Sequence, residues 1–207
     1  QRQKAIVDML PCYIIDTKRD SKIQELLAYD PHCIILGKSR IMADKNRYET
    51  YEYDVENKKY FLVEDEVLDS AEKILFKPMG STLPEPTFII SDADYVDWLT
   101  EAMGGFALPS VLKTYRKTKK YLFLGTSFDR DTDRMVANEL TLDLEGGYVI
   151  TDKELGKKEK KFIEKPAIKE QWLKSINYGV LGKPIFLERQ ENKVKVIPTI
   201  SIEECPW

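Results

Sequence analysis

Short apolar runs that suit β-strands alternate with stretches of helical spacing along most of the chain, and this alternation limits the fold more than any other feature. The strand-like runs fall at 12–16, 33–37, 73–76, 87–91, 121–124 and 146–151. Helical apolar spacing follows at 20–29, 92–103, 108–118 and 129–140. Strands that alternate with helices usually form a parallel sheet covered on both faces. The sequence therefore predicts an α/β, Rossmann-like three-layer core with a mostly parallel sheet, in which the runs at 12–15, 73–76 and 121–124 are central strands.

Two further segments predict β-hairpins that are added to this core. Residues 48–63 alternate aromatic and charged side chains on both sides of a polar turn. We expect this hairpin at an edge of the sheet, as an insertion between the early strands and the turn at Met79. A second hairpin is predicted near 183–202.

Charge and cysteine content exclude several classes of function. The net charge is −3, so no basic field exists that would attract nucleic acid, and no nucleic-acid partner is expected. No apolar run reaches the roughly 18 residues of a membrane span, and no membrane is expected. The cysteines are too few and too scattered for a disulfide framework or a zinc site: Cys12, Cys33 and Cys205. Such usage fits a reducing compartment, and we expect a cytoplasmic protein.

Small and polar residues follow the strand-like run at 121–124, where Gly125, Thr126 and Ser127 precede a predicted helix. In parallel α/β sheets the ligand crevice lies at the carboxyl ends of the strands, and helix N-termini bind phosphate. The alternative is that Ser127 merely caps the helix. Gly80 and Ser81 follow another strand and would reach the same edge of the sheet, as would residues 16–20.

Other titratable residues have structural interpretations. His32 is the only histidine, and its place in a turn that leads into a strand favours a surface or partly buried role over that of a base. Without it no Ser-His-Asp set can form. Asp92, Asp94 and Asp97 open a helix, where the helix dipole explains them. The tyrosines of segment 48–60 suit cross-strand packing.

Four segments in the same order resemble the sirtuin-like domains of many bacterial proteins, including NAD-hydrolysing defence proteins. They are "IIDTKRD" at 14–20, "LFKPMGS" at 75–81, "PEPTFIISDADY" at 84–95 and "YLFLGTSFDRDTDR" at 121–134. The resemblance extends over roughly residues 11 to 170. It implies a single sirtuin-like α/β domain over residues 1–207, and no metal site.

The resemblance also implies a degenerate site. The family's general-base histidine stands before a Gly-Ser pair, where this chain has Met79, whose thioether accepts no proton near neutral pH. The family's asparagine falls at Lys18 and the neighbouring aromatic residue at Arg19. No glycine-rich phosphate turn is found upstream of Pro11, so we expect the domain to be N-terminally incomplete. The resemblance assigns the nucleotide contacts to five residues: Gly80, Ser81, Gly125, Thr126 and Ser127.

These features predict a catalytically inactive sirtuin-like domain that binds a nucleotide, NAD or ADP-ribose, or scaffolds other proteins. A protein partner or a homo-oligomer is expected, in a bacterial defence or multiprotein system. One alternative is an active NAD hydrolase (NAD glycohydrolase) whose missing elements lie outside this chain or are replaced, with Asp16 or Asp20 as the base. Another is a structural component of a larger assembly that uses the fold only as a shape.

Overall fold

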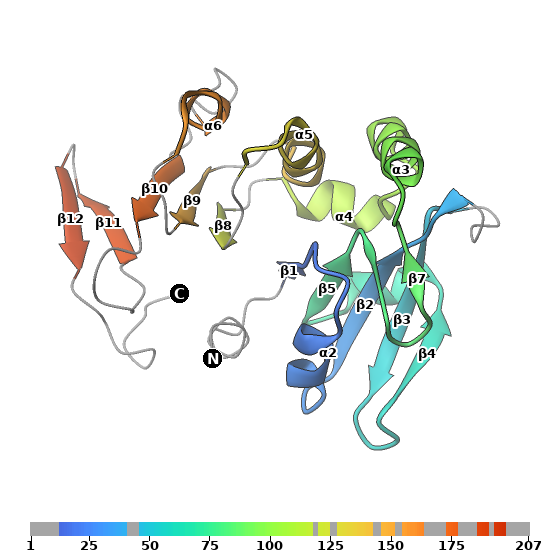
Figure 1. Cartoon of the computed structure of the whole chain (residues 1–207). Coiled ribbons are helices and arrows are strands. Elements are labelled where there is room, and N and C mark those ends of the chain that lie inside the picture. The colour runs from blue at the N-terminus through green and yellow to red at the C-terminus, as the bar shows by residue number, and fades with distance from the viewer. Residues whose placement is uncertain are drawn as a thin grey trace. The chain divides into compact units, whose positions relative to one another are not determined.

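The computed structural model describes residues 13–40, 46–117, 120–124, 128–142, 146–151, 155–163, 173–177, 186–190 and 193–197. They belong to two compact units, Gln1–Thr114 and Tyr115–Trp207, and both contain strands and helices (Figure 1). Each unit is described by itself. The single domain expected over residues 1–207 stays a prediction.

A five-stranded sheet forms the centre of the first unit (Figure 1). Its spatial order is β1-β5-β2-β3-β4. The strand β5 runs parallel to its neighbours β1 and β2, whereas β3 runs antiparallel to β2 and to β4. The strands are β1 (Tyr13–Ile15), β2 (His32–Gly37), β3 (Tyr48–Asp54), β4 (Lys59–Val63) and β5 (Ile74–Lys77).

The mostly parallel sheet predicted from the sequence is wrong for this unit, because half of its strand pairings are antiparallel. The connection at 38–47 is shorter than the dozen or so residues that a parallel crossover needs. β3 therefore returns beside β2 and pairs with it along the whole of His32–Gly37. The segment at 48–63 is a hairpin at the sheet edge, as its alternation indicates, but it extends the main sheet directly.

Helices and a short ribbon complete the first unit. The α3 helix starts with a capping box, in which the Ser91 hydroxyl accepts from the Asp94 amide and the Asp94 carboxylate accepts from the Ser91 amide. It ends at Gly105, whose φ of 84° is left-handed. The elements are α2 (Lys22–Leu27), η2 (Asp65–Asp69), β6 (Gly80–Ser81), β7 (Thr87–Phe88), α3 (Asp92–Gly104) and α4 (Ser110–Tyr115).

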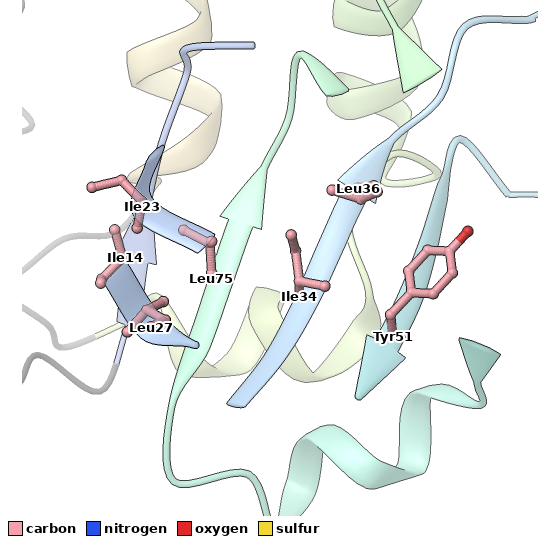
Figure 2. Packing of buried hydrophobic residues seen from close by; sticks show 7 residues of the cluster. All are labelled: Ile14, Ile23, Leu27, Ile34, Leu36, Tyr51 and Leu75. Atoms are coloured by element: carbon pink, nitrogen blue, oxygen red, sulfur yellow. The ribbon is translucent and has the colours of Figure 1, made fainter. Parts of the chain in front are cut away.

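One core cluster of the first unit lies on the sheet face that α2 covers (Figure 2). Leu75 is in register with Ile14 on one side and Ile34 on the other, and Ile34 is in register with Tyr51. Residues in register point to the same face, so four strands contribute to one apolar row. From α2, Ile23 and Leu27 pack against this row, and Leu36 completes the cluster. Each such burial contributes about 1.5–3 kcal/mol.

The second unit contains a separate, parallel sheet with the order β10-β9-β8. A small cluster of Phe128, Val149, Leu155 and Phe162 is buried in this unit. The strand β8 was predicted to be central, yet among the described strands it ends this sheet, as β1 ends the other. The elements are β8 (Lys120–Leu124), α5 (Asp131–Leu140), β9 (Gly146–Thr151), α6 (Lys157–Ile163), β10 (Leu173–Asn177), β11 (Phe186–Gln190) and β12 (Lys193–Ile197).

The strands β11 and β12 pair antiparallel, within the range where a second hairpin is predicted. Both units therefore combine helices with sheets, and the fold class is mixed α/β. Within the described ranges, no helix has the length and apolar character required to span a bilayer.

Candidate functional site

The turn after β5 holds Met79, the residue that the sequence resemblance predicts at the position of a general base. Met79 is buried, with 4% of its surface exposed. Its carbonyl accepts a hydrogen bond from the Ile89 amide at 3.3 Å, which links the turn to the segment before α3. A buried thioether fills space and takes part in no proton transfer.

Gly80 is required by the local backbone. Its φ is 81°, and a Cβ built there would lie 1.7 Å from the Thr87 carbonyl oxygen. In the ribbon of β6 and β7, Gly80 is in register with Phe88. Only glycine combines this left-handed conformation with so close an approach of two backbones. A contact between Gly80 and a nucleotide stays a prediction.

The hydroxyl of Ser81 is engaged inside the protein. Ser81 is fully buried, and its Oγ donates to Gln24 Oε1 at 2.6 Å. The same amide donates through Nε2 to the Leu83 carbonyl at 2.7 Å. A hydroxyl has one proton to donate, so Ser81 retains only acceptor capacity toward a ligand. The network fixes α2 to the turn after β5.

A buried lysine organises the loop after β1. Lys77 is fully buried, and its Nζ donates to Asp16 Oδ2 and to the carbonyls of Lys18 and Asp20, each at 2.7 Å. These contacts use all three ammonium protons. The last residue of β5 thereby fixes the conformation of residues 16–20.

The two basic residues of this loop differ in their surroundings. The Lys18 side chain is exposed, and its amide donates to Asp16 Oδ1 at 3.0 Å. Arg19 donates from Nε and Nη2 to the Ile89 carbonyl, at 3.0 and 2.6 Å. Arg19 therefore ties the loop to the same segment that Met79 contacts. Both carboxylate oxygens of Asp16 are engaged.

Two of the three predicted strand ends thus lie together, because Lys77 binds the loop at 16–20 directly. The third, Gly125, Thr126 and Ser127, lies outside the described residues. The predicted crevice between Met79 and that segment stays a prediction.

Sequence reasoning missed Lys77 and Gln24, the two residues that hold these segments together. A signal for Lys77 exists, because it is a charged residue that ends an otherwise apolar strand, and a buried charge needs partners. Gln24 gives no comparable signal, since polar residues are ordinary in a short surface helix.

His32 is more deeply buried than the sequence suggests. It begins β2, is 3% exposed and stacks on Tyr53 with ring centroids 4.9 Å apart. Burial lowers its pKa below the ordinary value of 6.5, so the ring is neutral at pH 7. Nδ1 then donates to the Asp30 carbonyl at 2.7 Å, and Nε2 accepts from the Tyr60 hydroxyl at 2.8 Å. This histidine is a packing residue.

The acidic residues at the start of α3 also have structural partners. The hydrogen bond from the Ser91 side chain lowers the pKa of Asp94. Asp97 pairs with Arg47, and its other oxygen lies 3.9 Å from Arg40. Among the described side chains, no group of three or more His, Cys, Asp or Glu residues could hold a metal ion.

The sequence matches the model of a known protein family. The family model described as SIR2-like domain matches residues 37–176, well over half of the chain. The matched range includes Met79, Gly80 and Ser81, and it begins after the loop at 16–20. No curated protein and no solved structure matches the sequence. The chain belongs to the SIR2-like domain family.

Proposed function

We propose that this chain is a catalytically inactive SIR2-like module that binds NAD or ADP-ribose or scaffolds a protein partner. Membership of the family suggests a nucleotide-binding or NAD-related module. Inactivity is the further step, and the buried Met79 at the position of the family's base supports it.

No other histidine replaces the missing base. His32 is the only one in the sequence, and both of its ring nitrogens are engaged, by Asp30 and Tyr60. A base must reach the ribose hydroxyl from which it takes a proton. A neutral imidazole with both nitrogens bonded inside the protein does not meet this requirement.

The carboxylates that could act as a base in an active hydrolase are Asp16 and Asp20. Asp16 is ion-paired with the buried Lys77, and its second oxygen accepts from the Lys18 amide. Asp20 accepts from the Lys22 amide at 3.2 Å. Because both carboxylate oxygens of Asp16 have partners, a structural role is favoured for Asp16. Asp20 is then the remaining candidate base for an active hydrolase.

For the nucleotide we propose contacts at Gly80, Ser81, Gly125, Thr126 and Ser127, within a Rossmann-like core. The parallel arrangement of β1 and β5 supports this, because their carboxyl ends lead into the loop at 16–20 and the turn at Met79. We place the module in the cytoplasm, within a defence or other multiprotein system, on the resemblance to bacterial sirtuin-like domains.

NAD turnover by the full chain tests the proposal, beside calorimetry with NAD and ADP-ribose. We expect no turnover from the wild type or from Met79→His, since Lys18 still stands where the family has asparagine. Met79→Leu is the matched control for lost packing. Robust hydrolysis by the wild type would establish the alternative, and Asp20→Asn would then show whether Asp20 is its base. Robust hydrolysis by Met79→His alone would show that the rest of the site is intact.

A further inference from the structure

The strand β4 ends the five-stranded sheet, and among the described strands it pairs only with β3. The backbone N–H and C=O groups on an outer edge can pair with another strand. Two large apolar side chains of β4 reach solvent, since Phe61 is 50% and Leu62 is 65% exposed. As neighbours in a strand they point to opposite faces. The outer edge is therefore apolar on both faces of the sheet.

The two ends of β4 carry opposite charges. Lys58 and Lys59 are exposed at its start, and Glu64 and Glu66 are exposed just after its end. Among the ion pairs between described residues, none involves any of these four side chains. Asp65 differs, because its carboxylate accepts hydrogen bonds from Tyr48 and Thr50.

We propose that β4 pairs antiparallel with β4 of a second copy of this chain, which makes one continuous sheet across a homodimer. A two-fold axis reverses the strand, so the lysines of each copy face the glutamates of the other at both ends. A parallel arrangement would place like charges together. Opposite charges across neighbouring strands attract and like charges repel. The charge pattern is thus self-complementary, as a homodimer requires.

The two-fold axis also restricts the register. It must stand perpendicular to the sheet, so that facing residues lie on the same face, and it passes between one residue of β4 and the same residue of the partner subunit. Within β4, only Phe61 or Leu62 at this position sets Lys58 opposite Glu64 or Glu66 of the partner subunit. Both registers place the lysine end against the acidic end. With Phe61 on the axis, Tyr60 faces Leu62 of the partner subunit. Tyr60 packs against the core cluster of the first unit, so this contact would extend the apolar row across the dimer.

Sedimentation equilibrium of the full chain at low salt measures the association. We expect a dimer for the wild type. Lys58→Glu/Lys59→Glu and Glu64→Lys/Glu66→Lys should each associate at least about tenfold more weakly, because each sets like charges face to face. An equimolar mixture of the two variants should restore a dimer that contains one copy of each. Lys22→Glu/Lys157→Glu is the matched control for the lysine variant, since it changes the net charge equally at exposed positions outside β4.

Lysines on edge strands can also serve to prevent pairing. Lys58→Ala/Lys59→Ala separates the two roles, because the proposal predicts weaker association and a protective role predicts stronger association. A monomeric wild type, stronger association of the alanine variant, or a dimer that both charge reversals leave intact would each overturn the proposal. Circular dichroism shows that each variant is folded. The proposal does not rest on nucleotide binding, which calorimetry with ADP-ribose measures separately.

Discussion

At the scale of single residues, the buried Lys77 connects β5 to the loop at 16–20. Its ammonium neutralises Asp16 and satisfies two carbonyls in a place that water does not reach. Lys77→Met should lower the free energy of unfolding by about 3–5 kcal/mol, because it leaves a largely buried carboxylate without its partner. Urea unfolding at neutral pH measures this. The control is Lys73→Met, whose partner Asp30 is 43% exposed, and which should cost about 1 kcal/mol or less. Equal losses of unfolding free energy in the two variants would contradict this structural role of Lys77.

The pH dependence of stability should depend on His32. Burial lowers its pKa from the ordinary value of 6.5, so the unfolded chain takes up a proton at a pH where the folded chain does not. The contribution of His32 to the free energy of unfolding is therefore constant above that value and falls as the pH drops below it, until the lowered pKa is reached. Because the chain has one histidine, His32→Gln should flatten the curve between about pH 7 and 5. If the free energies of unfolding of the wild type and of His32→Gln changed with pH in parallel, this role of His32 would be disproved.

Residue identities predicted part of the candidate site. The Gly-Ser pair after a strand predicted that the chain turns there; the turn lies at Pro78 and Met79, and Gly80 and Ser81 form β6. What the sequence did not show is that Ser81 donates to Gln24, or that Lys77 binds that loop. Both contacts join residues more than fifty positions apart. Local patterns carry no information about such distances, whereas a chain turn is encoded by its own residues.

At the scale of elements, α3 tests how much a helix cap contributes. Ser91→Ala removes the acceptor for the Asp94 amide and should lower the free energy of unfolding by about 1 kcal/mol. Ser70→Ala is the control, since that exposed hydroxyl only donates to the Val67 carbonyl. It should change stability by less than about 0.5 kcal/mol. Thermal unfolding followed by circular dichroism distinguishes the two, and an equal effect would show that the cap does not contribute.

Helices were predicted better than strand pairing. The bounds of α3 follow from apolar spacing and from Ser91 and Gly105 at its ends, which are local signals. The segment at 48–63 was recognised as a hairpin for the same reason. β3 joins β2 and makes the sheet half antiparallel. This pairing depends on the length of the connection between the two strands and on which edge of the sheet is free. Alternation alone specifies neither.

At the scale of the whole molecule, the sheet order predicts where the first unit is most resistant to opening. β2 is buried throughout and has a neighbour on both sides, whereas β4 has one neighbour among the described strands and carries exposed side chains. Amides of β2 and β5 should exchange with deuterium most slowly, and those of β4 much faster. Exchange mass spectrometry at low protein concentration measures this order. Protection of β4 equal to that of β2 in dilute solution would contradict it.

The contact between Lys77 and the carbonyl of Lys18 also affects how the loop at 16–20 can change in evolution. The ammonium binds the main chain at position 18, which every amino acid supplies, and the side chain at that position points into solvent. Mutation can therefore exchange the residue at 18 without altering the shape of the loop. Substitutions at position 18 should therefore cost little in folding free energy, so that only the chemistry of the exposed side chain constrains which residue stands there.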